Sequence, residues 1–567
     1  MNNDTLIRES LLYKNRENHE ESDCRQVDPG MEVEGCRWVD IKDVKKIKEA
    51  MLPIYLDEEG RGLFTKFSHA TVIGSTGTGK SEVVVKNMIQ MFSLLDNKAK
   101  PSFVASDLKG DISRQLYPHL IKSGYKVIVM DMKHPYQSSR YNFMSRIYDD
   151  YHETLRLRKL LEGGYCKENY KADGYSSEKE ARNAINAKIY TLTDSVEKAI
   201  DELANIIIVC TDQKDSSWFQ GARTMFSAIV LTLLHDSENP KNGMTREKFT
   251  IANVCRAAFH TNDDCEEIVS WLRRAEKLLT VQNAITGNYE LRAKVTRDGY
   301  VSTINTALRA YTTNAVGVLT ESSYDIDLRK VAKRDEPYAI FLITDDRQKV
   351  TNSIAMMFIN DLVAELIQYA DSDDYSRLKR DFVFLLDEFA NMPPMPEMSR
   401  KITTLRSRRM WMIMAIQSIQ QLSQVYGEET SEIIRDNCDL SIFLGSNNLS
   451  TKEVFAKSMG RKAGISTSYQ KGNDGNTSEN VTTSDVPVVR ISDLDALSLG
   501  QFYIRARVIE NLKTSMVPYF SRPEAKIASG YKEGEFRAFD PMANLYDIAE
   551  ILQMESSSST KSFSYKF

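Results

Sequence analysis

The segment from Thr71 to Ser81, TVIGSTGTGKS, is the most informative part of this chain for its fold class. Its apolar start predicts a strand, and the pattern of Ser81 to Leu95 predicts a helix directly after it. Glycines let the backbone between them wrap with its N–H groups inward, where those groups and the helix N-terminus bind phosphate oxygens. We therefore predict a nucleotide-binding loop that consists of Gly74, Ser75, Thr76, Gly77, Thr78, Gly79, Lys80 and Ser81.

Two side chains of this loop have expected roles, because the loop fits the pattern G-x-x-x-x-G-K-[ST]. Lys80 is expected to reach the β- and γ-phosphates of ATP, and Ser81 to ligate Mg²⁺. The alternative is a glycine-rich turn with an incidental lysine. Average composition gives such a chance match a probability on the order of a few per cent. The loop therefore predicts an ATPase with ATP and Mg²⁺ as cofactors.

A second stretch, Phe382-Val-Phe-Leu-Leu-Asp-Glu388, is an apolar strand that ends in two acids. Asp387 is expected to hold Mg²⁺, and Glu388 to orient and polarise the attacking water. The same pattern also fits a core strand that ends in two surface acids. The phosphate-binding loop favours the functional interpretation, because phosphoryl transfer needs such a partner.

The next predicted strand, Met410 to Ile416, has polar residues at both ends. Gln417 after it is interpreted as a contact to the γ-phosphate or the water, with a simple strand cap as the alternative. Arg406, Arg408 and Arg409 precede it. In a ring, one of these arginines would reach the ATP of a neighbouring subunit as an arginine finger. We select Arg406 for this role. The alternatives are a solvated basic turn or contacts to a DNA backbone.

Alternating strand and helix patterns before residue 150 and after residue 300 predict an α/β class with a mainly parallel sheet covered by helices. The region between them has only helical periodicity and predicts an inserted all-α domain. Three segments are predicted separately: a short amphipathic helix over Val39 to Met51, a loop over Tyr165 to Ser177 and a mobile loop over Gly464 to Ser484. The predicted domain boundaries are 1–50 for a charged N-terminal segment, 51–149 and 300–525 for the α/β domain, 150–299 for the all-α domain, and 526–567 for a C-terminal extension with a disordered Ser-rich tail.

Composition limits the partners and the compartment. The 567 residues are 42% hydrophobic and 27% charged, with a formal net charge of −5, so a nucleic acid would need local basic patches. The seven cysteines form no C-x-x-C pair, which argues against a zinc site or a disulfide framework and favours the cytosol. We find no signal peptide and no apolar run of the roughly 20 residues that a membrane span needs.

One further motif is interpreted as a decoy. Leu497-Ser-Leu-Gly-Gln501 resembles the signature of ABC-transporter ATPases. That signature precedes the acidic strand in those proteins, whereas here it follows Asp387 by more than a hundred residues, and Leu499 replaces one of its glycines. The order of the motifs therefore argues against this class.

Five blocks occur in a fixed order along the chain. They are VIGSTGTGKS, SDLKGDI at 106–112, GYKVIVMDMKHPYQSSRYN at 124–142, LLDEFANMPPMPEMSRKITTLRSRRMWMIMAIQSIQQLSQVYG at 385–427 and IIRDNCDLSIFLGSNN at 433–448. In this order they resemble the type IV secretion coupling proteins of the TraG/TraD group, the DNA-transfer ATPases of bacterial conjugation. The resemblance extends over residues 65–145 and 300–510, and the predicted all-α domain lies where this family carries its own.

The resemblance implies a homo-hexameric ring of RecA-like domains with ATP between subunits. DNA would pass through the central channel, single-stranded during transfer and without sequence specificity. The all-α domain would select DNA bound to a relaxase and deliver it to the type IV secretion channel proteins. Lys80, Ser81, Asp387, Glu388 and Gln417 match the nucleotide-site positions of the family. Two more residues, Asp107 and Lys109, match the family without an assigned role.

The chain departs from the family at one point, because family members usually begin with membrane-spanning helices. The expectation is therefore a cytoplasmic protein at the inner face of the membrane, held there by a separate membrane-anchoring partner, or a soluble member of the family. The alternatives are a DNA translocase of the FtsK/HerA kind, an ATP-driven protein-export motor that ignores nucleic acid, and an ATP-binding scaffold without turnover.

Overall fold

The structure is a computed structural model that describes residues 24–553 with short gaps. Residues 1–23 and 50 of the predicted N-terminal segment and the predicted Ser-rich tail, Glu555 to Phe567, lie outside the described residues. The gaps are residues 50, 211–215, 262–264, 292, 322–324, 334–335, 346, 374, 472–476, 508, 528–530 and 532–533.

A ten-stranded sheet forms the centre of the part that is described. Its strands from β11 to β7 are all parallel, and only β14 runs against its neighbours β11 and β15. The mainly parallel sheet predicted from the sequence is thus confirmed. In sheet order the strands are β1 (Arg25–Gln26), β15 (Leu512–Ser515), β14 (Gln501–Ala506), β11 (Leu440–Gly445), β5 (Ala70–Gly74), β10 (Met410–Ile416), β9 (Phe382–Leu386), β6 (Ser102–Ser106), β8 (Tyr338–Ile343) and β7 (Lys126–Asp131).

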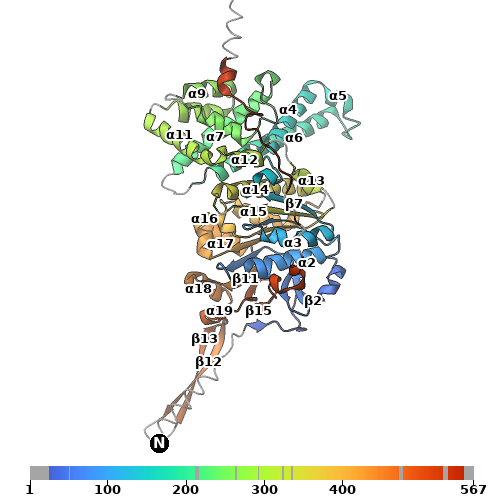
Figure 1. Ribbon diagram of the computed structural model, residues 1–567, viewed down its shortest axis with the longest axis vertical. Helices are drawn as coiled ribbons and strands as arrows, with labels where there is room; N and C mark the ends of the chain where they lie inside the picture. The colour runs from blue at the N-terminus through green and yellow to red at the C-terminus, as the bar shows by residue number, and fades with distance from the viewer. Residues whose placement is uncertain are drawn as a thin grey trace, which may run out of the picture.

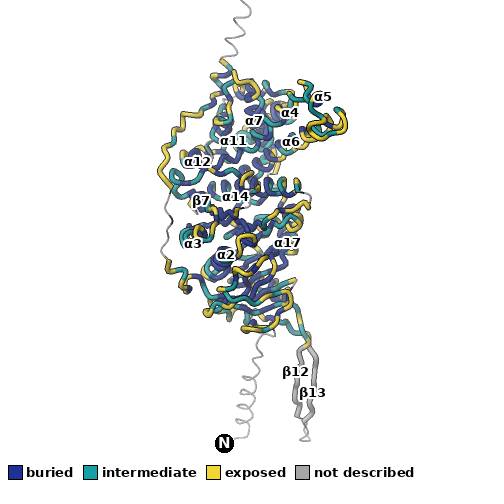
Figure 2. The backbone as a smooth tube through the Cα atoms, turned by 90° about the vertical axis from the view of Figure 1, so that its right-hand side faces the viewer, coloured by how far each residue is buried: buried dark blue, intermediate teal, exposed yellow. Residues whose placement is uncertain are grey.

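Helices cover both faces of this sheet, so its central strands are buried along their whole length. Alternate residues of each strand enter two different cores, because successive side chains point to opposite faces. On one face, Phe103 and Val383 join the core under α2 (Lys86–Leu94) and α3 (Asp111–Lys122). On the other face, the neighbouring residues join a core that continues into the helical region, as the dark-blue tube in Figure 2 shows.

Helix α14 (Lys349–Asp371) lies between the sheet and the helical region (Figure 1). Within the described ranges it is the one helix long and apolar enough to cross a membrane. However, 78% of its most apolar stretch is buried inside the protein. Its hydrophobicity is explained by this position, since a helix with a buried surface on several sides is apolar all round.

The helical region is stacked above α14 and is formed by the chain between the two halves of the sheet (Figure 1). Helix α7 lies at its centre and is buried along most of its length. The predicted loop over Tyr165 to Ser177 begins with the short helix α5 and is to that extent wrong. The helices are α4 (Ser145–Glu162), α5 (Tyr165–Asn169), α6 (Glu178–Ile207), α7 (Ser216–Ser237), α8 (Ile251–Phe259), α9 (Glu266–Leu272), α10 (Leu279–Ala284), α11 (Lys294–Leu308), α12 (Asn314–Leu319) and α13 (Leu328–Lys333).

The helix predicted over Val39 to Met51 is confirmed only in part. A 3₁₀ helix at Ile41–Lys46 lies between β2 (Cys36–Asp40) and β3 (Met51–Leu56), and both strands pair with β4 (Arg61–Lys66) in an antiparallel sheet. Asp40 is the N-cap of this helix, because its side chain accepts a hydrogen bond from the backbone N–H of Lys42 at 3.0 Å. The predicted bounds are too wide, since Val39 and Met51 belong to the flanking strands.

The loop predicted over Gly464 to Ser484 is wrong where the structure describes the segment, and residues 472–476 of it lie outside the described residues. The described parts belong to an antiparallel pair of β12 (Arg461–Lys471) and β13 (Thr477–Pro487), which pair with each other and with no further strand in the described part of the chain. The polar composition argued against a core. However, two hairpin strands need no core to pair, because the backbone N–H and C=O groups of one strand bond to those of the other. Its threonines, valine and isoleucine also favour extended backbone.

The C-terminal extension returns to the helical region. The backbone N–H of Arg537 donates to the carbonyl of Tyr136 at 2.9 Å, and its guanidinium pairs with Asp325 at 2.8 Å. Further along, the hydroxyl of the buried Tyr546 donates to Asp236, which has no exposed surface. This segment therefore fastens the end of the chain to helices that precede it by about three hundred residues.

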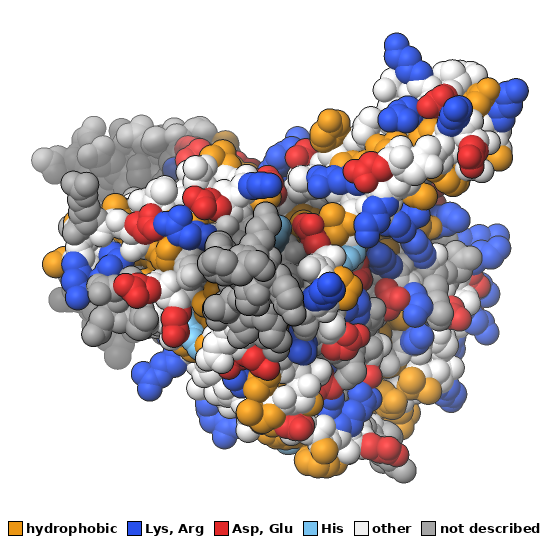
Figure 3. Space-filling model, turned by 90° about the horizontal axis from the view of Figure 1, so that it is seen from above, with side chains coloured by type: hydrophobic (Ala, Val, Ile, Leu, Met, Phe, Trp, Pro, Cys, Tyr) orange, Lys and Arg blue, Asp and Glu red, His pale blue; other side chains and the backbone are white. Residues whose placement is uncertain are grey.

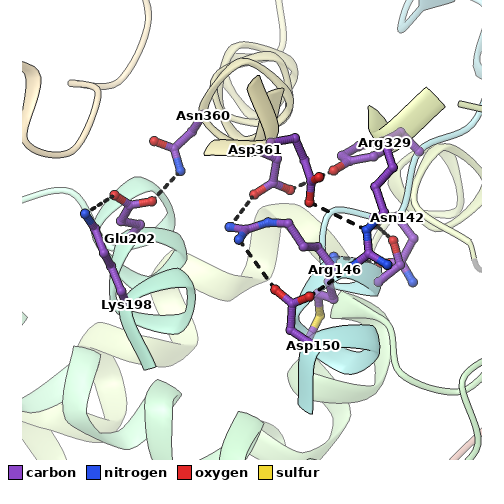
Figure 4. Close-up of polar contacts among 12 residues, drawn as sticks. Asn142, Arg146, Asp150, Lys198, Glu202, Arg329, Asn360 and Asp361 are labelled. Atoms are coloured by element: carbon purple, nitrogen blue, oxygen red, sulfur yellow. Dashed lines mark hydrogen bonds and ion pairs between the residues drawn. The ribbon is translucent and has the colours of Figure 1, made fainter. Parts of the chain in front are cut away.

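Two buried polar clusters join the helical region to α14 (Figure 4). In the first, the guanidinium of Arg146 lies 3.3 Å from Asp361 and 3.9 Å from Asp150. In the second, Glu202 of α6 accepts from Asn360 of α14 at 2.8 Å and from Lys401 of α15 (Met398–Leu405) at 2.9 Å. Burial lowers the pKa of Lys401, and Glu202 partly offsets this effect.

We expect Lys401→Met to destabilise the protein, because it leaves the carboxylate of Glu202 buried without its charge partner. The loss is expected to be about 3–5 kcal/mol. Lys198→Met is the matched control, since Lys198 reaches the same carboxylate at 4.0 Å but is 53% exposed, and its loss should stay below about 1 kcal/mol. Chemical denaturation of the two variants measures the difference. Adding Glu202→Gln to Lys401→Met should recover part of the loss, and equal losses for the two lysine variants would contradict the buried pairing.

Candidate nucleotide-binding site

The predicted loop connects β5 to a helix that starts as a π-helical turn, Lys80–Val85, and continues as α2. Gly77 and Gly79 have φ angles of 87° and 92°, a region that L-residues with side chains rarely adopt. A Cβ atom on Gly74 would lie 2.4 Å from the hydroxyl of Thr78. The glycines are therefore required by the tight backbone path, which leaves the loop N–H groups at the mouth of a cleft.

Lys80 lies folded across this loop. Its ammonium group donates to the carbonyl of Gly74 at 2.6 Å and lies 3.8 Å from the carboxylate of Glu388. The side chain is only 6% exposed. The structure thus brings the loop lysine and the second acid of the predicted strand together, although 308 positions separate them in the sequence.

Asp387 faces the loop from the end of β9. The hydroxyl of Ser81 donates to its Oδ2 at 2.7 Å, and Ser106 donates to its backbone carbonyl at 2.8 Å. Burial raises the pKa of Asp387. Its other oxygen, Oδ1, is buried without a hydrogen-bond partner among the described residues. A carboxylate oxygen and a hydroxyl side by side are the ligand types that Mg²⁺ prefers, so these residues fit the predicted ion.

Glu388 is held in place by two amides. The side chains of Gln417 and Asn391 donate to its Oε2 at 2.7 Å and 2.9 Å. Gln421 in turn donates to the amide oxygen of Asn391 at 2.8 Å. Glu388 itself adopts a left-handed backbone conformation with φ 57°, which directs the chain from β9 into the turn that carries Asn391. Sequence reasoning placed Gln417 near this site but missed Asn391 and Gln421. The position of Asn391 three residues after Glu388 was a signal, whereas Gln421 gave none.

Asp107 and Lys109 also reach the site. Asp107 is buried and accepts from the backbone N–H groups of Gly110 and Ser113 at 2.9 Å and 2.8 Å, so it caps the start of α3. Burial raises the pKa of its carboxyl group. Lys109 lies two residues further on the same loop and is exposed. Asp107 therefore fixes the loop on which Lys109 is presented.

The three arginines before β10 are paired within their own chain. Arg406 lies 2.7 Å from Asp439, Arg408 pairs with Asp371 at 2.8 Å, and Arg409 pairs with Asp381 at 2.5 Å. Among the described residues that line the cleft at the P-loop, none is one of these arginines. A finger role for Arg406 requires a neighbouring subunit and stays a prediction.

The cleft at the loop has a volume of about 460 Å³. Its lining contains the charged side chains of Lys80, Asp387 and Glu388 and also apolar side chains, among them Leu499 and Phe520. The lining residues are Ser75, Thr76, Gly77, Gly79, Lys80, Ser81, Glu82, Lys86, Asp107, Leu108, Lys109, Asp111, Ile112, Asp387, Glu388, Asn391, Gln417, Leu499 and Phe520.

A parallel sheet with this loop after one strand and two acids after another defines a P-loop nucleotide-binding protein. A sequence profile of the type IV secretory system conjugative DNA transfer family matches residues 41–490, and the chain belongs to this family. The resemblance inferred from the five sequence blocks is thus confirmed. No curated protein matches the chain in a sequence comparison.

Solved structures of a conjugative coupling protein have the same fold. The unbound form of the bacterial conjugative coupling protein TrwBdeltaN70 aligns with a TM-score of 0.57 at 14% identity, over 91% of this chain and 99% of that one. TrwB with the non-hydrolysable ATP analogue ADPNP aligns with 0.57 at 14%, over 90% and 99%. TrwB with ADP and Mg²⁺ aligns with 0.54 at 14%, over 92% and 98%. The predicted fold class, a RecA-like P-loop domain with an additional all-α domain, is therefore confirmed.

Proposed function

We propose that this chain is an ATP-hydrolysing coupling protein that drives DNA into a type IV secretion channel. The observation that carries the proposal is the convergence of Lys80, Ser81, Asp387 and Glu388 on one cleft in a member of the conjugative DNA transfer family. The complexes of TrwB with ADPNP and with ADP and Mg²⁺ support the choice of ATP and Mg²⁺ as ligands.

The chain's own residues account for binding and activation. The loop N–H groups and Lys80 hold the triphosphate, and Ser81 and Asp387 hold Mg²⁺ through a hydroxyl and a carboxylate oxygen. Bound Mg²⁺ neutralises charge on the phosphates. Glu388 accepts the proton of the attacking water, and Gln417 keeps the Glu388 carboxylate aimed at the cleft.

The partners follow from the family and remain proposals. We infer a homo-hexamer that encircles single-stranded DNA, receives it from a relaxase and docks at the cytoplasmic face of the membrane through a separate anchoring protein. Figure 3, which looks onto the helical end, shows Lys and Arg side chains gathered along one side of this face beside the projecting arm that carries α5. Such local basic clusters allow an acidic protein to contact a phosphate backbone.

Of the three arginines, Arg406 is the candidate for a finger between subunits. Its side chain is 43% exposed, against 22% for Arg408 and 38% for Arg409, so it is the one most accessible to a neighbour. It would have to leave Asp439 to reach a second subunit. A structure of the assembled ring with ADPNP tests this role, and an Arg406 still paired with Asp439 there would exclude it.

We expect DNA to raise the rate of ATP hydrolysis and to assemble rings. The measurement is the kcat of the full chain without DNA, with single-stranded DNA and with duplex DNA, together with electron microscopy of the protein with ADPNP and DNA. Because the contacts are ionic, the stimulation should decline as salt rises. Stimulation by duplex DNA alone would favour a translocase of the FtsK/HerA kind. No response to either DNA, with stimulation by a relaxase, would favour a protein-export motor and contradict the proposal.

A further inference from the structure

Two large apolar side chains at the nucleotide cleft are left exposed by the fold. Leu499 and Phe520 both line the cleft, yet they are 55% and 54% exposed. Neither is required by the phosphate chemistry described above, because neither carries a polar group. Exposed apolar surface inside a binding cleft is typical of a subsite for an apolar part of the ligand.

The strand order places Leu499 on the side of the P-loop away from the acids. The P-loop follows β5, and Glu388 follows β9, which lies two places from β5 on one side. Leu499 precedes β14, which lies two places from β5 on the other side, and because β14 runs antiparallel, its start lies at the same sheet edge as the ends of the parallel strands. Phe520 belongs to the segment after β15, which contacts α2 and then α3, where Nε2 of His119 lies 3.2 Å from the carbonyl oxygen of Glu524.

Leu499 packs directly on the end of the P-loop. A Cβ atom on Gly79 would lie 2.9 Å from Cδ1 of Leu499 and 2.8 Å from Cγ2 of Val83. Gly79 is the residue from which the helix after the loop begins. A triphosphate whose terminal phosphate lies between Lys80 and Glu388 thus has its nucleoside directed toward Leu499.

The segment that carries Phe520 is anchored to the same helix. Asn87 on α2 donates to the carbonyl of Val517 at 2.8 Å, and the buried Arg522 donates to the side chain of Asn87 at 3.1 Å. The turn that carries Leu499 is joined to it, since the N–H of Met516 donates to the carbonyl of Gly500 at 2.9 Å. Both apolar side chains are therefore held at fixed positions relative to the P-loop.

We propose that Leu499 and Phe520 form the nucleobase subsite of the cleft, an inference that rests on the proposed ATPase function. The ring of Phe520 stacks on the purine, and Leu499 packs against the base and ribose next to Gly79. Neither side chain has a donor or acceptor, so this pair contributes affinity for adenine and guanine alike. The motif Leu497 to Gln501, which has no role as an ABC signature, acquires a role through Leu499.

Calorimetric titration with two ligands tests the subsite. Mg·ADPNP carries a base, whereas Mg·tripolyphosphate engages only the P-loop residues. Stacking on an aromatic side chain is worth about 1–3 kcal/mol per base, so Phe520→Ala should weaken Mg·ADPNP binding by about 5- to 150-fold. Leu499→Ala should also weaken Mg·ADPNP binding. Both variants should leave Mg·tripolyphosphate binding unchanged. In steady-state assays the KM for ATP should rise at constant kcat, and Phe520→Tyr should retain the affinity.

Matched controls are Leu279→Ala and Phe536→Ala, which remove similarly exposed apolar side chains outside the cleft. Unchanged Mg·ADPNP affinity in Phe520→Ala and Leu499→Ala would overturn the inference and leave the ATPase proposal intact. An equal loss of affinity for Mg·tripolyphosphate would also overturn the inference, because Leu499 and Phe520 would then stabilise the P-loop and not bind the base. If the unaltered protein binds neither ligand, the proposed function fails instead.

Discussion

Glu388→Gln is expected to lower the kcat of ATP hydrolysis by about 10²- to 10⁴-fold while Mg·ATP binding is retained. The structure gives the reason. The carboxylate lies 3.8 Å from Lys80 and is held by the amides of Gln417 and Asn391, so its orientation toward the proposed position of the terminal phosphate is fixed. Glutamine keeps the shape but cannot accept a proton from water. Single-turnover hydrolysis and calorimetric binding of ADPNP measure the two effects separately.

The control for this variant is Glu397→Gln. Glu397 lies on the same segment but outside the cleft, where it pairs with Lys198 at 3.0 Å, and its side chain is 44% exposed. Its replacement should leave kcat unchanged. A kcat for Glu388→Gln within twofold of the unaltered protein would show that another group activates the water. A loss of ADPNP binding in the same variant would assign Glu388 to ligand binding instead.

Lys80→Ala is expected to remove both affinity and turnover. Its ammonium group is the single cation that the fold holds inside the loop, bonded to Gly74 and close to Glu388. Loss of one preorganised donor of this kind costs about 10²- to 10³-fold in rate. Affinity for ADPNP and for tripolyphosphate should decrease as well, because the charge contacts ground-state phosphates. Lys80→Arg should not restore activity, since the planar guanidinium does not fit the position of a compact ammonium.

The matched control is Lys122→Ala, which removes an exposed lysine at the end of α3 and should change neither quantity. Thermal unfolding of Lys80→Ala should remain close to that of the unaltered protein. Full hydrolysis by Lys80→Ala would contradict the proposed site, and DNA-stimulated turnover in this variant would contradict the motor as well.

The comparison of the two variants separates binding from chemistry. The Glu388→Gln variant should still bind ATP and assemble rings on DNA but should not hydrolyse the ATP. The Lys80→Ala variant should already fail to bind ATP. This order follows from the proposed roles, in which Lys80 and its loop bind the phosphates and Glu388, after the end of β9, faces them.

Several elements could be predicted from the sequence because their cause is local. The P-loop is one, since its glycines, lysine and serine are consecutive and their backbone path depends on the residues themselves. Strands β8 and β9 are others, because strands buried on both faces become continuous apolar runs. Failures occurred where a local pattern had two solutions. The three-and-four spacing near Val44 fitted both a longer helix and a short 3₁₀ helix between two strands, and the polar segment around Gly464 fitted both a loop and a hairpin.

Local patterns were sufficient to predict the phosphate-binding loop, the acids after β9 and the alternation of strands and helices. The fold alone brings Ser81 to Asp387, 306 positions away, and packs Leu499 on Gly79. It also joined Lys401 to Glu202 across the boundary between the sheet and the helical region. The physical reason is that hydrogen bonding and periodicity within a segment depend on neighbouring residues. Contacts between distant segments depend instead on strand order and helix packing, which the cooperative burial of the whole chain selects.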